Sequence, residues 1–160
     1  MLYRESYRFG LPIALLVLLI DQATKWLMLL VVMAPPRIIE VTGFFNLVLA
    51  WNTGVSFSAF AGSGPAGRWI LVGVAVVICG FVLAWMGRTQ RRLLIAGFAV
   101  IVGGALGNVI DRLIHGAVVD FLDFHLAGWH WPAFNLADTA ITLGVVAIIA
   151  DSLFGPRHGR

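Results

Sequence analysis

The chain has 160 residues, of which 60% are hydrophobic and only 12% are charged, and its mean hydropathy is +0.93. Soluble domains carry about twice that share of charge, so the composition excludes an ordinary water-soluble protein. The isoelectric point near 9.8 would suit a nucleic-acid-binding protein, but the basic residues are spread over short connections between apolar stretches. We therefore expect lipid, not water or nucleic acid, to surround most of the chain.

Four apolar stretches are each long enough to cross about 30 Å of hydrocarbon as a helix. They lie approximately at residues 10–32, 68–87, 93–115 and 134–154. We predict an all-α membrane protein with four transmembrane helices, organised as a single domain over residues 1–160. Within these stretches, Gly103 and Gly107 form a GxxxG step that predicts close helix packing, and the lone Cys79 is interpreted as a packing residue.

The distribution of arginines predicts the orientation of the helices, because short connections rich in Lys and Arg lie on the cytoplasmic side. Arginines precede the first stretch, separate the second from the third and follow the fourth: Arg4, Arg8, Arg88, Arg91, Arg92, Arg157 and Arg160. We expect both termini inside and the segments 34–67 and 115–133 outside. A signal peptide cleaved after Ala34 is the alternative for the first stretch, and Asp21 and Lys25 within that stretch argue against it.

The first outer segment has the composition of short strands. Residues 38–58 are rich in Val, Ile, Phe and Trp and are interrupted at Gly43 and at Asn52-Thr53-Gly54. Such runs, bounded by turn residues, predict strands joined by turns. We expect a small extended, β-rich lobe on the outer face, with the aromatic residues of both outer segments at the membrane interface.

Several polar residues lie where composition does not explain them. A charged residue at the centre of a membrane helix costs about 2.5 to 3.5 kcal/mol. Asp21 and Lys25 are spaced i, i+4 and can pair on one face, and an ion pair that only keeps the helix soluble in lipid is the alternative to a functional role. Near the outer end of the third stretch, Asn108, Asp111 and Arg112 stack on one face. Arg112 can reach the interface, but the shorter Asn and Asp side chains indicate a role inside the bundle.

Three further acids fall near the same outer end. Asn135 as a helix N-cap with Asp138 three positions later resembles a capping box, which is a structural alternative to a catalytic role. Asp120 and Asp123 lie in an apolar segment that we expect to re-enter the outer membrane face. Two carboxylates brought close in a site of low dielectric constant share a proton, so one activates water while the other protonates the substrate. This convergence of acids indicates aspartic-protease chemistry.

The sequence contains few of the residues that other hydrolytic sites require. No HExxH motif is present, and the histidines lack the spacing of metal ligands, so we expect no zinc or other metal site. A Ser/Lys dyad would have to use Lys25, the only lysine, with Ser56 or Ser58.

Five motifs, in chain order, resemble those of bacterial lipoprotein signal peptidase, also called signal peptidase II. They are Asp21-Gln22-Ala23-Thr24-Lys25, Asn52-Thr53-Gly54, Gly103 to Arg112, Val118-Val119-Asp120-Phe121 and Phe134-Asn135-Leu136-Ala137-Asp138. The resemblance implies a four-helix aspartyl peptidase of the bacterial inner membrane, with its active site toward the periplasm. It implies removal of the signal peptide from prolipoproteins, before a cysteine that carries diacylglycerol. It implies no metal or organic cofactor, no nucleic acid and no obligate protein partner.

The resemblance also implies roles for individual residues. The catalytic pair falls on Asp120 and Asp138. Supporting or substrate-positioning roles fall on Asp21, Lys25, Asn52, Gly54, Asn108, Asp111, Arg112, Asn135 and Ala137. From the residues alone, Asp111 and Asp123 compete with Asp120 for the catalytic role. We expect the lipid-modified cysteine to approach laterally, with its acyl chains in the bilayer, while the outer lobe holds the segment over the pair.

Two other functions fit the residues taken alone. A small membrane carrier or proton relay also uses intramembrane Asp and Lys, and it predicts a site at the membrane midplane without cleavage. A structural or assembly role predicts that the Asn and Asp residues are only caps and interhelical hydrogen-bonding groups, so that Asp→Asn changes are nearly silent.

Overall fold

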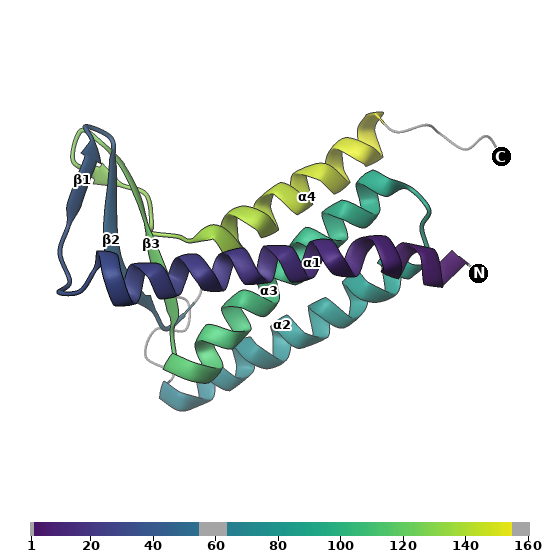
Figure 1. Ribbon diagram of the computed structural model, residues 1–160, viewed down its shortest axis with the longest axis horizontal. Coiled ribbons are helices and arrows are strands. Elements are labelled where there is room, and N and C mark those ends of the chain that lie inside the picture. The colour runs from purple at the N-terminus through teal and green to yellow at the C-terminus, as the bar shows by residue number, and fades with distance from the viewer. Residues whose placement is uncertain (1, 55–63, 155–160) are drawn as a thin grey trace.

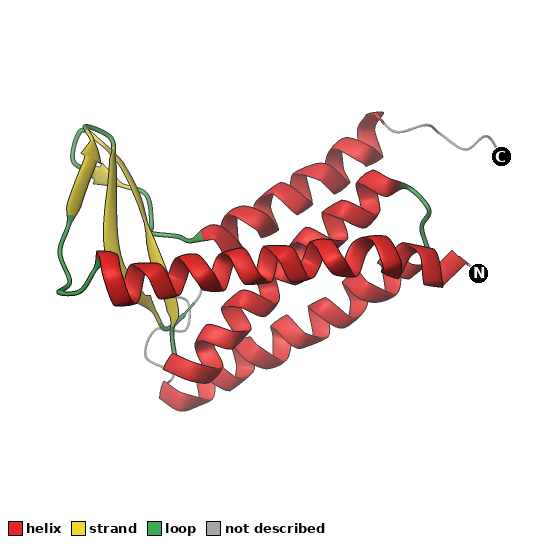
Figure 2. Ribbon diagram, in the orientation of Figure 1, coloured by secondary structure: helices red, strands yellow, loops and turns green. Residues whose placement is uncertain are grey.

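The computed structural model describes residues 2–54 and 64–154. Helices alternate with short strands along the chain (Figures 1 and 2). The elements are α1 (Leu2–Leu27), which continues into a π-helical turn η1 (Met28–Val32), β1 (Ile39–Thr42), β2 (Phe45–Asn52), α2 (Gly64–Gly87), α3 (Arg92–His115), β3 (Val118–Leu126), β4 (Trp129–His130) and α4 (Leu136–Phe154).

Four helices of the described chain are long and apolar enough to cross a membrane. They span Arg4–Val32, Ala66–Gly87, Arg92–His115 and Leu136–Phe154. The predicted class, a helical membrane protein with four spanning helices and a small extended lobe, is confirmed. The fourth helix begins at Leu136, two residues later than predicted, because Asn135 is its cap.

The helix α3 lies at the centre of the bundle and packs against the other three helices (Figure 1). Glycines on α3 permit this close approach. A Cβ atom on Gly103 would lie 2.5 Å from the carbonyl oxygen of Ala14 on α1, and one on Gly104 would lie 2.5 Å from that of Ala137 on α4. The prediction that this glycine segment serves close helix packing is therefore confirmed. Cys79 is likewise a buried free thiol on α2.

The strands form one antiparallel sheet in the order β1-β2-β3-β4, which covers one end of the bundle (Figure 2). β2 pairs with β3 from Phe45 opposite Phe124 to Asn52 opposite Val118. The predicted extended lobe is present, and it also includes Asp120 and Asp123, whose segment is strand β3. Residues three apart on a strand point to opposite faces, so these two acids do not stack.

The sheet lies where α1 ends, α2 begins, α3 ends and α4 begins (Figure 1). The start of α1, the connection between α2 and α3, and the end of α4 lie at the opposite end of the bundle. This arrangement puts the two predicted outer segments on one side of the molecule. That this side faces the periplasm stays a prediction from the arginine distribution.

Candidate active site

Asn135 connects two carboxylates at the sheet end of the bundle. Asp120 comes from β3 and is only 2% exposed, and Asp138 comes from the first turn of α4. The Asn135 side chain donates through Nδ2 to Asp120 Oδ1 at 2.6 Å, and its backbone N–H donates to Asp138 Oδ2 at 3.3 Å. The Asp138 N–H donates back to Asn135 Oδ1 at 3.0 Å. The capping box proposed as an alternative to catalysis is therefore present, and the same cap bridges both acids.

Each carboxylate receives a second amide donor on its other oxygen. Asn52, at the end of β2, donates to Asp120 Oδ2 at 3.0 Å, and Asn108 of α3 donates to Asp138 Oδ1 at 2.9 Å. The Oδ1 atom of Asn108 accepts a hydrogen bond from Lys25 at 2.9 Å, so the orientation of its amide is fixed. Two strands and two helices thus converge on the pair of acids.

A buried charge cluster lies behind this pair. Lys25 Nζ is 2.9 Å from Asp21 Oδ2 and 2.8 Å from Asp111 Oδ2, and all three side chains are at most 2% exposed. The predicted pairing of Asp21 with Lys25 is correct, and α3 adds Asp111 to it. Charges taken out of water require close partners, and here each carboxylate has one. Because α1 supplies two of these three groups, it is an integral part of the fold.

The two acids of the cluster also hold the backbone beside the candidate pair. Asp21 Oδ1 accepts the N–H of Ala137 at 2.9 Å, and Asp111 Oδ2 accepts the N–H of Val119 at 3.1 Å. Ala137 directly precedes Asp138, and Val119 directly precedes Asp120. The cluster therefore fixes the positions of both carboxylates from behind. Asp111 is committed to these contacts, which argues against it as an alternative to Asp120.

Gln22 is a supporting residue that the sequence reasoning did not single out. Its side-chain amide donates to Asp111 Oδ1 at 2.9 Å and to the carbonyl oxygen of Gly107 at 3.2 Å. It lies beside Asp21 in the first motif. An amide side chain within a membrane helix, next to a charged pair, is the sequence feature that could have indicated its role.

Arg112 is directed into the site and joins the turn after β2 to α3. Its Nη2 donates to the carbonyl oxygen of Gly54 at 3.1 Å, and its Nη1 donates to that of Asn108 at 3.3 Å. The Gly54 N–H in turn donates to Asn52 Oδ1 at 3.1 Å. Arg112 therefore keeps Asn52 in place over Asp120, and the interpretation that it merely reaches the interface is wrong.

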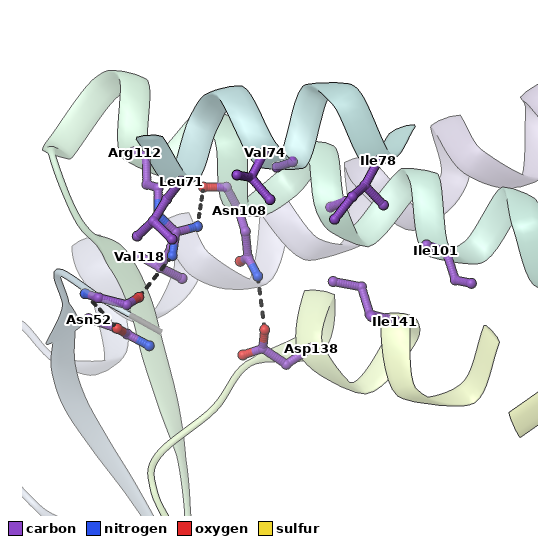
Figure 3. A pocket seen from close by; sticks show the side chains of 13 residues that line it. Asn52, Leu71, Val74, Ile78, Ile101, Asn108, Arg112, Val118, Asp138 and Ile141 are labelled. Carbon is purple, nitrogen blue, oxygen red and sulfur yellow. Dashed lines mark hydrogen bonds between the residues drawn. The ribbon is translucent and has the colours of Figure 1, made fainter. Parts of the chain in front are cut away.

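Asp138 lines a cavity of about 270 Å³ between α2, α3 and α4 (Figure 3). The polar part of the lining consists of Asn52, Gly54, Asn108, Arg112 and Asp138. Asp120 is connected to this lining through Asn52, from which it accepts a hydrogen bond. Burial raises the pKa of Asp120 to about 7, and the negative charge of Asp138 contributes to this rise. Asp120 can therefore hold a proton near neutral pH.

Asp123 lies outside this site. It accepts hydrogen bonds from Asn46 at 3.0 Å and from His130 at 2.9 Å, within the sheet. Burial raises the pKa of this carboxyl, but the hydrogen bonds from His130 and Asn46 outweigh burial and leave the pKa below its ordinary value. Asp123 is therefore a structural residue of the lobe.

The Ser/Lys alternative has no support at Lys25, whose ammonium is engaged by two carboxylates and an amide. Ser56 and Ser58 lie outside the described residues. Within residues 2–54 and 64–154, no group of three or more His, Cys, Asp and Glu side chains could hold a metal ion.

The fold and site together define a four-helix integral membrane protein in which Asn135 connects the buried carboxylate of Asp120 to the partly exposed carboxylate of Asp138 at one end of the bundle. The family described as signal peptidase (SPase) II matches residues 13–154, which is most of the chain. The protein therefore belongs to the signal peptidase II family and is a membrane peptidase. The resemblance that the sequence motifs indicated is thus confirmed.

Relatives and solved structures agree with this assignment. A lipoprotein signal peptidase of Azoarcus sp. (strain BH72) is 52% identical over 149 residues, which cover 92% of this chain and 84% of that protein. One of Rhodopseudomonas palustris (strain TIE-1) is 47% identical over 153 residues, covering 92% and 93%. A bacterial membrane enzyme solved by the in meso method at 2.3 Å resolution superposes with a TM-score of 0.79 at 27% identity, covering 94% of this chain and 93% of that one.

Proposed function

We propose that the protein is an aspartic endopeptidase that removes the signal peptide from prolipoproteins, with Asp120 and Asp138 as its catalytic residues. The observation that carries the assignment is the bridge through Asn135, which holds the two carboxylates in one site. The relatives named lipoprotein signal peptidase, similar over almost the whole chain, support the substrate class. The carrier alternative fits less well, since Asp120 and Asp138 and the cluster behind them gather at one end of the bundle.

The two carboxyl groups have different roles in peptide hydrolysis. Burial raises the pKa of Asp120 to about 7, so Asp120 keeps a proton near neutral pH. Asp138 lines the cavity and is placed to take a proton from water as the water oxygen attacks the scissile carbonyl carbon. Asp120, which burial keeps protonated, donates its proton to the carbonyl oxygen.

The resulting tetrahedral intermediate collapses when the nitrogen of the leaving amine takes the proton held by Asp138. The C–N bond then breaks, the intermediate returns the hydroxyl proton to Asp120, and a carboxylic acid and an amine are released. The pair ends in its starting protonation state, so no metal or external cofactor enters the balance. The hydrogen bonds from Asn52 and Asn108 keep both carboxylates oriented through the cycle.

The substrate that suits this site is a prolipoprotein whose cysteine already carries diacylglycerol. The catalytic pair lies where the apolar helices meet the sheet, so a lipid-anchored segment reaches it laterally from the membrane (Figure 1). With the start of α1 and the arginine-rich connection between α2 and α3 in the cytoplasm, this site lies at the periplasmic face of the inner membrane.

The substrate class is tested by incubating the purified protein with one prolipoprotein in two forms, with and without diacylglycerol on its cysteine. We expect cleavage directly before the cysteine of the modified form and none of the unmodified form. The released peptides are identified by mass spectrometry. Equal cleavage of both forms would contradict recognition of the lipid.

A further inference from the structure

The cavity beside Asp138 is one end of an apolar groove that has α3 as its floor and α2 and α4 as its walls (Figure 3). The floor is a single stripe of α3 side chains, spaced by four, three and four residues: Ile101, Ala105, Asn108 and Arg112. The α2 wall is a matching stripe: Leu71, Val74, Ala75 and Ile78. The groove therefore runs parallel to the helices, away from the sheet and into the membrane-spanning part of the bundle.

The groove is polar only at the catalytic end. Arg112, Asn108 and Asp138 lie there, and the lining beyond them is aliphatic (Figure 3). Arg112 and Ile101 are 11 positions apart, which corresponds to about 16 Å along a helix. The acyl chains of one leaflet span about half of the roughly 30 Å hydrocarbon core, or about 15 Å. The groove thus has the polarity and the length of one ester-linked acyl chain.

The groove is also open toward the bilayer. The α2 wall is open sideways, since Val74 and Ile78 are 50% and 47% exposed. A single flexible chain can therefore enter laterally from the bilayer.

We propose that this groove holds one acyl chain of the diacylglyceryl group on the substrate cysteine. The inference rests on the proposed function and deepens it. The ester end of the chain lies by Arg112 and Asn108, and the glycerol, the sulfur, Cβ and Cα of the cysteine connect it to the scissile peptide bond at Asp138. The chain exchanges one apolar environment for another, so the groove contributes little affinity. Its role is to position the scissile bond, because it fixes the distance between that bond and the lipid.

The alanine in the α2 wall gives a selective test. Ala75 lies midway along the groove, and Ala75→Phe fills the part beyond it. Two prolipoproteins that differ only in their acyl chains, dioctanoyl and dipalmitoyl, are compared by kcat/KM in the same detergent. Overpacking of this kind lowers kcat/KM by about tenfold or more, and we expect that loss for the dipalmitoyl substrate alone. Ala105→Leu, on the floor at the same level, is the second variant.

Val77→Phe is the matched control, because Val77 is on the same helix and 57% exposed. We expect this variant to cleave both substrates like the wild type. Equal loss of both substrates in Ala75→Phe and Ala105→Leu, or loss of neither, would overturn the acyl-chain assignment while wild-type cleavage upholds the function. Failure of the folded wild type to cleave either substrate would instead reject the proposed function.

Discussion

Asn135 shows how one residue serves both the fold and the site. The sequence presented capping and catalysis as alternatives for the segment around Asp138. In the structure the side-chain oxygen Oδ1 of Asn135 accepts the Asp138 N–H and caps α4, while its Nδ2 donates to Asp120. A strong capping pattern therefore does not exclude a functional role when the cap also carries a donor group on its other side.

Substitutions at Asn135 separate its two roles. Serine is as good an N-cap as asparagine, whereas Ala costs about 1 kcal/mol of stability. Neither side chain reproduces the amide donor to Asp120. The Asn135 amide also donates to the Val119 carbonyl oxygen, so both variants lose stability, and we expect Asn135→Ser to lose less of it than Asn135→Ala because serine keeps the cap. Both variants should lower kcat/KM by about 10- to 100-fold, the value of a hydrogen bond to the charged form of Asp120. An Asn135→Ser variant with wild-type activity would show that the bridge is dispensable.

The pKa of Asp120 predicts the pH dependence of cleavage. Because burial raises this pKa to about 7, the shared proton is lost as the pH rises through neutrality, and we expect kcat/KM to fall there. The Asn52 amide stabilises the ionised form of Asp120, so Asn52→Ala raises the pKa further. The alkaline limb of the Asn52→Ala profile should therefore lie at higher pH. A limb that stays in place or moves to lower pH contradicts this role of Asn52.

The same raised pKa links Asp120 to stability. The folded protein holds this proton more tightly than the unfolded chain, whose carboxyl has its ordinary value of 3.8. The contribution of Asp120 to stability is therefore complete below that value and is lost as the pH rises through about 7. Asp120→Asn removes this contribution, so its unfolding temperature should vary less between pH 4 and 7 than that of the wild type.

At the scale of elements, the helices and the strands of the first outer segment could be predicted from sequence, but β3 and β4 could not. Apolar stretches of about twenty residues predict helices in lipid, because a helix satisfies its own backbone hydrogen bonds there. The segment of β3 gave no such signal. Its first four residues are all buried, so the alternation that marks a half-buried strand is missing. Only its pairing with β2, more than 60 positions away, makes it a strand.

The contact of α3 with α4 gives a prediction for Gly104. A methyl group there would lie 2.5 Å from the carbonyl oxygen of Ala137, so Gly104→Ala pushes the start of α4 away from α3. We expect a loss of cleavage activity of at least about tenfold, because Asp138 moves with Ala137. The matched control is Gly73→Ala on α2, where a Cβ meets nothing within 4 Å. The control should be active and slightly more stable, since alanine favours a helix.

At the scale of the whole molecule, the motifs indicated the polar residues of the candidate site but not how they are connected. The Asp21–Lys25 pair follows from helical spacing. The links from Lys25 to Asp111, and from both acids to the backbone of β3 and α4, join positions distant in sequence. Spacing within one helix cannot reveal such contacts. These contacts join the separate polar residues into one site.

Lys25→Met tests whether this cluster supports the fold. It leaves Asp21 and Asp111 buried without their cation, and breaking a buried pair in this way costs about 3 to 5 kcal/mol. The free energy of unfolding in detergent measures the loss. Lys25→Met combined with Asp111→Asn removes one of the two unpaired charges and should recover part of it. A double variant that is less stable than Lys25→Met would contradict the account.

The most direct test of the central claim is cleavage of a diacylglyceryl-modified prolipoprotein by the purified wild type and by Asp120→Asn, Asp138→Asn and Asp123→Asn. The account predicts that the first two variants remain folded and lose nearly all activity, because neither can share the catalytic proton. Asp123→Asn, whose side chain belongs to the sheet, should retain activity. Full activity in Asp120→Asn or Asp138→Asn would show that this pair does not perform the reaction.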